Sequence, residues 1–472
     1  MESYDAIVEN GFRLARIRPL STFSIDVDTA SYSNTRRFLE GGQLPPIDAI
    51  RVEEFINYFT YAYPPATQDK PISAIIETAQ CPWNETTRLV RIGLKAKDVP
   101  EGERPKSNLV FLIDVSGSMA DFNKLPLVKR SLQAMVQHLG DDDRIAIAVY
   151  AGHSGVALSS ERCTEDNKPR ILKTIDNLDA GGSTHGSEGI QTAYEIAANN
   201  FKENGVNRVI LATDGDFNVG VTDKDALARL IEEKAKTGVF LSVLGFGMGN
   251  IKDSTLEKLA DKGNGHYAYI DTFNEARKVL IEEMGATLVA VAKDVKIQVE
   301  FNPAKVEAYR LIGYENRAIA DEDFKDDTKD AGEMGAGHAV TALYEIAAPG
   351  STIKMPDVDP LKYQPTELSS HEWSGELLTL KVRYKDPKAD TSQELVWPVL
   401  DETLEFESAS EDFRWAAAVA SLGMILRESP YVGTFTCDDV IRIAQHARGA
   451  DSNGYRAEFI QIAFAAKSLK PE

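Results

Sequence analysis

Four short runs of almost wholly apolar residues constrain the fold of this chain more than any other feature. Each run has the length of a strand, and a strand that is apolar throughout has to be covered on both faces, as in a parallel sheet. The runs are 110–113, 145–149, 209–212 and 239–244. Amphipathic stretches at helical spacing separate and follow them, at 125–139, 187–201, 223–236, 254–260 and 274–284. Strand alternating with helix predicts an α/β domain with a doubly wound, mostly parallel sheet.

The segments on either side of this region have a different pattern. Residues 295–301 and 377–384 alternate apolar and polar side chains, which is typical of antiparallel strands with one buried face. Residues 72–98 are also strand-like, and we expect them to join the same β-domain. The α/β domain is then an insertion in an antiparallel β-sandwich-like domain, with further helices near the N- and C-termini.

These patterns predict five segments, because 472 residues are too many for one hydrophobic core. They are an N-terminal region of helices and a strand at 1–70, a first part of the β-domain at 71–104, the α/β domain at 105–285, a second part of the β-domain at 286–405 and a C-terminal helical region at 406–472. The last of these contains three apolar-striped stretches, at 412–426, 437–447 and 454–469.

Charge and cysteine usage exclude several classes of function. A net charge of −21 argues against unassisted binding to nucleic acid or to anionic lipid, since both require clustered basic residues. No apolar run is long enough to cross a membrane, so we expect no membrane insertion. The cysteines, Cys81, Cys163 and Cys437, form no closely spaced pair. They therefore support neither a disulfide framework nor a thiolate zinc site.

Oxygen-bearing side chains follow the strands of the predicted parallel sheet. Asp114, Ser116 and Ser118 alternate directly after the first apolar run, Thr184 lies in a Gly-Gly-Ser-Thr loop and Asp214 follows the third run. Ligands of such sheets bind at the carboxyl ends of the strands, so we expect these side chains to converge. Carboxylate and hydroxyl oxygens suit Mg²⁺, Mn²⁺ or Ca²⁺ and disfavour zinc and copper.

In order and spacing these three motifs resemble the metal-ion-dependent adhesion site of von Willebrand factor type A (VWA) domains, and the resemblance covers about 105–285. It implies that Ser116, Ser118 and Thr184 ligate the cation directly, while Asp114 and Asp214 act through bound water. An open coordination position would then accept a carboxylate from a partner protein. The expected cation is Mg²⁺, with Ca²⁺ or Mn²⁺ as alternatives.

More of the chain resembles one bacterial family, in which a VWA domain lies between an N-terminal region and a C-terminal domain of unknown function. The matching segments are 19–32, 52–59 and 454–459. Members typically begin with an export or lipoprotein signal, which is absent from this chain. The resemblance implies residence outside the cytoplasm, in the periplasm or at the cell surface. It also implies that a lipid can anchor the full-length protein.

The resulting hypothesis is metal-ion-dependent protein–protein binding, for adhesion or complex assembly, without enzymatic activity. One alternative is a structural scaffold whose metal only orders loops. Another is that Asp114, Ser116 and Ser118 merely cap the helix that follows.

A third alternative belongs to a different class, the phosphatases. Asp26 and Asp28 follow a short strand in a DxDxT pattern, as in haloacid-dehalogenase-like phosphatases, where the first aspartate attacks phosphorus. This pattern lies outside the doubly wound region, where such a nucleophile belongs. Capping or a local hydrogen-bonded turn is therefore the simpler interpretation of the two aspartates.

Overall fold

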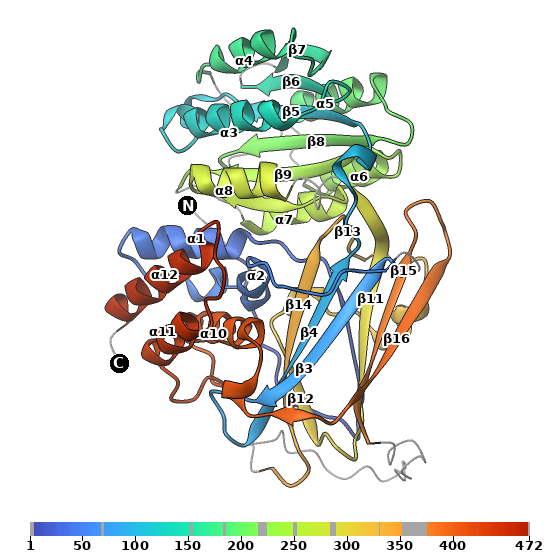
Figure 1. Cartoon of the computed structure of the whole chain (residues 1–472). Helices are drawn as coiled ribbons and strands as arrows, with labels where there is room; N and C mark the ends of the chain where they lie inside the picture. Colours follow the sequence, from blue (N-terminus) through green and yellow to red (C-terminus); the bar gives the residue numbers. More distant parts are fainter. Residues whose placement is uncertain are drawn as a thin grey trace. The chain divides into compact units, whose positions relative to one another are not determined.

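The computed structural model (Figure 1) divides the chain into two compact units. Unit 1 comprises Met1–Asp5, Asp28–Asn34 and Val99–Ala290, and unit 2 comprises Ala6–Val27, Thr35–Asp98 and Val291–Glu472. The predicted α/β segment 105–285 lies within the long stretch of unit 1, and residues 28–34 join that unit as well. The structure describes residues 4–67, 70–151, 154–182, 186–215, 224–248, 253–283, 289–329, 331–351 and 375–470.

Unit 1 contains the predicted parallel sheet. Within the described residues its strand order is β10-β9-β8-β5-β6-β7, and only the pairing of β7 with β6 is antiparallel. The strands are β5 (Ser107–Asp114), β6 (Arg144–Tyr150), β7 (Ser154–Arg162), β8 (Val206–Thr213), β9 (Phe240–Phe246) and β10 (Tyr267–Ile270). Every residue of β5 and β8 is buried. The doubly wound sheet inferred from the four apolar runs is thereby confirmed.

Helices cover both faces of this sheet. Ile190 of α5, Leu227 of α6 and Leu256 of α7 share one core with Val110 and Leu112 of β5. On the other face α3 packs against both α4 and α8, and Figure 1 shows α3 and α8 in front of the strands. The helices are α3 (Leu125–His138), α4 (Lys168–Asp176), α5 (Gly186–Asn199), α6 (Lys224–Ala235), α7 (Asp253–Lys262) and α8 (Phe273–Arg277), the last continuing as a π-helical segment (Lys278–Glu282).

Unit 2 contains two mainly antiparallel sheets. Within the described residues one has the order β1-β12-β14-β4-β3-β17 and the other β13-β11-β15-β16, with β2 also paired to β11. Strands β3 and β4 precede the α/β region in the chain, and β4 pairs with β14, which follows it. This pairing confirms the insertion. The strands are β1 (Arg13–Leu14), β2 (Leu20–Ser24), β3 (Ile72–Gln80), β4 (Thr87–Ala96), β11 (Ala290–Phe301), β12 (Ala308–Ile312), β13 (Met334–Gly335), β14 (Ala339–Ala347), β15 (Glu376–Lys385), β16 (Ser392–Leu400) and β17 (Thr403–Leu404).

Aromatic side chains join the two sheets of unit 2. Phe301 of β11 stacks on Tyr309 of β12 with ring centroids 4.2 Å apart, and it meets Tyr344 of β14 edge-on at 5.2 Å. Phe23 of β2 contacts the same Tyr344 ring at 6.4 Å. Such contacts between facing sheets are the packing of a β-sandwich.

The helices of unit 2 pack around a second aromatic cluster. Phe59, Trp415 and Phe459 contact one another edge-on, with centroids 5.1 to 5.6 Å apart. Figure 1 shows α10, α11 and α12 next to one another near the C-terminus. Part of the predicted N-terminal region at 1–70 forms a 3-10 turn followed by the short helix α2. The helices are α1 (Ala30–Glu40, whose first residues belong to unit 1), the 3-10 turn Ile47–Ala49, α2 (Val52–Asn57), α10 (Glu411–Leu426), α11 (Cys437–His446) and α12 (Tyr455–Leu469).

Candidate metal centre

The central strand β5 ends in the candidate site. Asp114, its last residue, is fully buried, and its Oδ1 accepts a 2.8 Å hydrogen bond from the backbone N–H of Ser116. This bond fixes the turn out of the strand. A 3-10 turn (Gly117–Ala120) follows, and it places Ser118 Oγ 3.0 Å from Ser116 Oγ. The structure therefore brings together the three residues of the predicted DxSxS motif.

A second loop is attached to this turn by backbone hydrogen bonds. Gly181 N–H donates to the carbonyl of Val115 at 2.7 Å, and Gly117 N–H donates to the carbonyl of Gly182 at 3.1 Å. Gly181 and Gly182 open the Gly-Gly-Ser-Thr motif that contains Thr184. Thr184 itself lies outside the described residues, so its role as a ligand stays a prediction.

Asp214, which follows β8, is held by a lysine that the sequence did not single out. The Asp214 side chain is fully buried, and its Oδ2 lies 2.9 Å from Nζ of Lys124, whose side chain is 6% exposed. The same ammonium donates to the backbone carbonyl of Ser118 at 2.9 Å. Lys124 thus links the loops that follow β5 and β8.

One sequence signal could have identified this lysine. Lys124 is the residue directly before α3, and a cation at a helix N-terminus is disfavoured by the helix dipole. A negatively charged partner elsewhere in the fold offsets such a placement. That partner, Asp214, is 90 residues away in the chain, and no local pattern identifies it.

The electrostatics of Asp114 fit a cation. The pKa of this carboxyl is raised to about 6. Burial is the largest cause, hydrogen bonds from Ser116 act in the opposite direction, and the Asp214 carboxylate adds to the rise. Asp114 Oδ2 is buried and has no hydrogen-bond partner of normal geometry among the described residues, although the nearby Tyr150 hydroxyl lowers the pKa of this carboxyl. A buried acceptor of this kind is normally satisfied by an ion or by ordered water. The donor set of carboxylate and hydroxyl oxygens matches Mg²⁺, Mn²⁺ or Ca²⁺ rather than zinc.

The site differs from metal centres built mainly from acidic, histidine or cysteine side chains. Across the part of the chain that the structure describes, no group of three or more such residues is placed to hold a metal ion. The candidate centre combines only two carboxylates with hydroxyl groups. The presence and identity of a bound metal therefore stay predictions.

Two large apolar side chains are adjacent in sequence to parts of this site, one close to Lys124 and the other next to Gly247, whose backbone approaches Lys124. Phe122, two residues before Lys124, is 83% exposed, and Met248 is 53% exposed. Met248 follows Gly247, which has φ +81° and approaches Lys124 so closely that a Cβ added at Gly247 would lie 2.4 Å from Lys124 Cε. Exposed apolar side chains that gather near one site are typical of protein-binding surfaces.

The two aspartates of the DxDxT pattern have separate structural partners. Asp28 Oδ1 accepts a 2.9 Å hydrogen bond from the backbone N–H of Tyr267, the first residue of the edge strand β10. Asp26 lies 3.2 Å from the guanidinium of Arg317 in an ion pair within unit 2. Asp28 therefore acts as a cap, although it caps a strand that is distant in sequence rather than a local turn.

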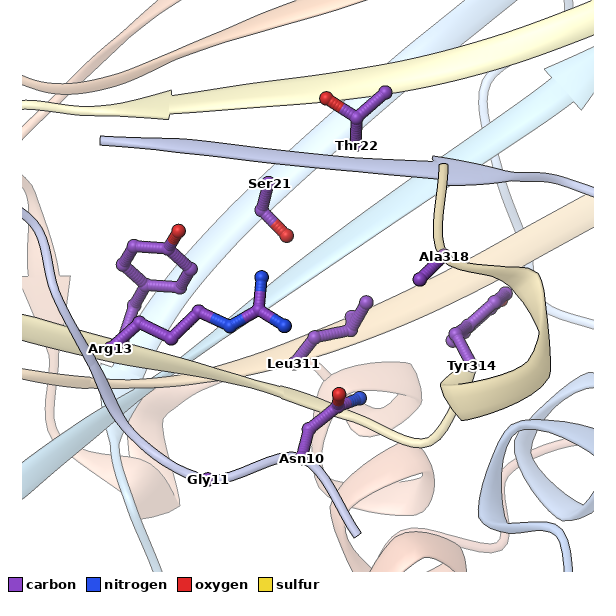
Figure 2. Close-up of a pocket in the computed structure, with 9 residues that line it drawn as sticks. Asn10, Gly11, Arg13, Ser21, Thr22, Leu311, Tyr314 and Ala318 are labelled. Atoms are coloured by element: carbon purple, nitrogen blue, oxygen red, sulfur yellow. The ribbon is translucent and has the colours of Figure 1, made fainter. Parts of the chain in front are cut away.

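Unit 2 has a small pocket, shown in Figure 2, whose polar groups are largely occupied. Asn10 Nδ2 donates to the carbonyl of Gly313 at 2.8 Å, and Tyr309 donates its hydroxyl proton to the carbonyl of Leu20 at 2.6 Å. The Ser21 hydroxyl bonds to that of Tyr344 at 2.9 Å. These bonds fix the walls of the pocket, which the side chain of Arg13 also lines.

The comparisons with known proteins agree with the fold and with the order of its segments. A family model described as von Willebrand factor type A domain matches residues 108–282, one described as von Willebrand factor matches residues 1–91, and one described as uncharacterized protein YfbK, C-terminal, matches residues 286–469. The mostly parallel sheet with loops converging at the end of β5 is thus a von Willebrand factor type A domain. Domains of this class commonly mediate metal-dependent protein interactions, and many bind a divalent cation.

One relative extends along nearly the whole chain. The uncharacterized protein YfbK of Escherichia coli (strain K12) is 44% identical over 467 residues, which is 97% of this chain and 80% of that protein. The chain belongs to the YfbK family. The resemblance to a bacterial VWA family that the sequence motifs indicated is confirmed.

More distant similarities are confined to part of the chain or to general architecture. The uncharacterized protein sll0103 of Synechocystis sp. is 30% identical over 189 residues, 40% of this chain and 43% of that protein. The solved structure of a von Willebrand factor type A protein from Catenulispora acidiphila is 15% identical and has a TM-score of 0.43, with 80% of this chain and 87% of that chain covered. Among the described helices, none is both long and apolar enough to cross a membrane.

Proposed function

We propose that this protein binds a partner protein through a divalent cation, Mg²⁺ by preference, held where β5 and β8 end. The observation that carries the proposal is the convergence of Asp114, Ser116 and Ser118 on one turn, with the carboxylate of Asp214 tied to the same turn through Lys124. Oxygen donors from separate loops that meet in a buried setting are what a hard cation requires.

In this proposal the hydroxyl groups of Ser116, Ser118 and Thr184 hold the cation, and Asp114 and Asp214 act through bound water. Hydroxyl ligands carry no charge, so the cation keeps most of its own charge. Such a cation can attract a carboxylate presented by a partner protein. The site is therefore suited to recognition of an acidic side chain.

The surroundings of the site support a protein as the partner. Phe122 and Met248, 83% and 53% exposed, offer apolar contact area close to Lys124. Apolar anchors beside a polar contact are typical of protein–protein interfaces. We propose that these two side chains pack against residues that flank the partner's carboxylate.

We also propose that the protein is not an enzyme. Asp28, the proton-handling residue of the phosphatase alternative, is bonded to the edge strand β10, and Asp26 is paired with Arg317. Both aspartates therefore make structural contacts in place of the catalytic roles that the phosphatase alternative requires. Release of phosphate from a model ester that depended on Mg²⁺ and was lost on Asp26→Asn would reverse this conclusion.

The test of the proposed function compares Ser116→Ala with Ser131→Ala. Ser131 is a buried serine of α3 that donates to a helix carbonyl at 2.7 Å, so its replacement removes a hydroxyl group from the same unit outside the site. We expect Ser116→Ala to abolish the heat of Mg²⁺ binding in titration calorimetry and Ser131→Ala to retain it. Equal Mg²⁺ binding by both variants would contradict the proposed site.

The same variants separate recognition from a scaffold role. If the cation serves recognition, Ser116→Ala loses partner binding while the midpoint of thermal unfolding in chelator stays that of the unsubstituted protein. If the cation only orders loops, Mg²⁺ raises that midpoint strongly and Ser116→Ala lowers it whenever Mg²⁺ is present.

Residence outside the cytoplasm is part of the proposal, since VWA proteins of this kind are often extracellular. Fractionation of the source bacterium tests it. Recovery of the native protein with the cell envelope or periplasm is expected, and recovery with cytoplasmic markers alone would contradict it.

A further inference from the structure

We infer that Lys124 keeps the Asp214 carboxylate from neutralising the bound cation, so that Lys124 weakens cation binding and strengthens capture of a partner's carboxylate. The inference rests on the proposed function and adds to it a residue that sets the balance between the two binding steps.

The lysine is built into the site rather than lying near it by chance. Its ammonium is 2.9 Å from Asp214 Oδ2 and 2.9 Å from the carbonyl oxygen of Ser118. Its aliphatic stem runs against the backbone of Gly247, where a Cβ would lie 2.4 Å from Lys124 Cε. A second acid, Asp121, is 3.9 Å away, but its side chain is 72% exposed and therefore well screened. Asp214 is the dominant partner of Lys124.

The position of the lysine on its own helix also indicates a role outside that helix. Lys124 directly precedes α3 and makes no side-chain capping bond there. A cation at this end of a helix opposes the helix dipole. The buried ion pair with Asp214 offsets that unfavourable placement. Lys124 therefore stabilises the arrangement of the site although it interacts unfavourably with the dipole of α3.

The charges of the site explain what the lysine does. The buried charged side chains that the ends of β5 and β8 bring to this site are Asp114, Asp214 and Lys124, and they sum to one negative charge when both acids are ionised. A divalent cation brings the site to one positive charge, and a partner's carboxylate then brings it to zero. Without Lys124 the loaded site is already neutral and attracts a carboxylate less strongly.

The ion pair acts on geometry as well as on charge. Asp214 Oδ2 is engaged by the ammonium at 2.9 Å, so a cation that recruited this oxygen directly would have to displace the lysine from a buried position. Breaking a buried ion pair is costly, because it leaves a desolvated charge without a partner. Lys124 therefore favours the arrangement in which Asp214 stays with the protein and the cation stays under-neutralised.

The test measures Mn²⁺ affinity by calorimetry for the unsubstituted protein and for Lys124→Met, which keeps the stem beside Gly247 and removes the charge. The control is Lys236→Met, since Lys236 lies between α6 and the amino end of β9, whereas the site is at the carboxyl ends of β5 and β8, and it pairs with Glu232 on the surface. We expect Lys124→Met to bind Mn²⁺ on the order of tenfold more tightly, by loss of one repelling charge, and the control to be unchanged. Equal or weaker Mn²⁺ binding by folded Lys124→Met would overturn the inference.

A second arm tests the carboxylate step. Acetate is added to the Mn²⁺-loaded proteins, and displacement of Mn²⁺-bound water is followed by proton relaxation. Lys124→Met is expected to need a higher acetate concentration than the unsubstituted protein; an equal or lower requirement would contradict the inference. If Lys124→Met does not fold, Lys124→Gln, which retains a donor for the Ser118 carbonyl, takes its place in both arms.

The proposed function and this inference fail in different ways. Absence of Mn²⁺ binding by the unsubstituted protein would refute both the proposed function and the inference about Lys124. If Ser116→Ala abolishes Mn²⁺ binding and Lys124→Met leaves it unchanged, only the proposed role of Lys124 is refuted.

Discussion

A buried carboxyl group in α2 makes the stability of unit 2 depend on pH. Glu53 is 2% exposed, and its pKa is raised to about 8, first by burial and then by the nearby carboxylates of Glu315 and Glu54. Those two acids have basic partners of their own, Arg427 at 2.7 Å and Arg51 at 3.1 Å. Glu53 has no basic partner among the described residues, and therefore keeps its proton near neutral pH.

The difference between the folded and unfolded pKa sets the size of the effect. The unfolded carboxyl loses its proton near pH 4.5 and the folded one near pH 8, so between these values the folded protein binds more protons. The contribution of the Glu53 carboxyl to the free energy of unfolding is therefore fully present below about pH 4.5. It is lost as the pH rises toward 8. One pKa unit corresponds to about 1.4 kcal/mol, and the loss between pH 5 and pH 8 comes to roughly 3 kcal/mol.

Glu53→Gln removes the ionisable group while keeping its shape. Urea unfolding at pH 5, 6, 7 and 8 can be followed by tryptophan fluorescence, because all four tryptophans, Trp83, Trp373, Trp397 and Trp415, fall within the sequence ranges of unit 2. We expect the free energy of unfolding of the unsubstituted protein to fall by roughly 3 kcal/mol relative to Glu53→Gln over this range. Glu322→Gln, at an exposed position, is the matched control. An identical pH dependence in Glu53→Gln and in the unsubstituted protein would refute the reasoning.

Substitutions at three further positions test the site and its support. Phe122→Ala should weaken partner binding while leaving the calorimetric Mg²⁺ affinity unchanged; a change in Mg²⁺ affinity would contradict its assignment to the interface. Gly247→Ala should lower the free energy of unfolding of unit 1 by at least about 1 kcal/mol, because φ +81° disfavours a side chain and the new Cβ meets Lys124; calorimetric unfolding measures this. Asp28→Ala should cost about 1 to 3 kcal/mol by leaving the Tyr267 N–H without its acceptor, whereas Asp28→Asn, which keeps an oxygen, should cost less, and equal losses would rule out the cap.

The parts of the fold that could be predicted from the sequence are those in which burial leaves a local pattern. The apolar runs predicted β5, β6, β8 and β9, because a strand covered on both faces needs apolar residues throughout. The strand β7 has no such run, since it lies at the edge of the sheet and many of its residues are exposed. The α4 helix, only nine residues long, was missed for a similar reason, because its pattern is too short to be distinctive.

In the candidate site, too, residues with a local sequence pattern could be predicted, whereas residues whose partners are distant in the chain could not. Asp114, Ser116 and Ser118 could be predicted because alternation after a buried strand places them together. The roles of Lys124 and Asp28 depend on partners far away in the chain, 90 residues in one case and 239 in the other. Contacts at such separations leave no periodic signal, and only the folded chain shows them.

The most direct test of cation-dependent partner binding uses the immobilised protein and an envelope fraction of the source bacterium. Material is bound in Mg²⁺, eluted with chelator and bound again after Mg²⁺ is restored, with Ser116→Ala and Ser131→Ala in parallel. The account predicts a protein that the unsubstituted chain and Ser131→Ala retain in Mg²⁺, release in chelator and recapture, and that Ser116→Ala never retains. Retention of the same proteins by every variant, with or without chelator, would contradict it.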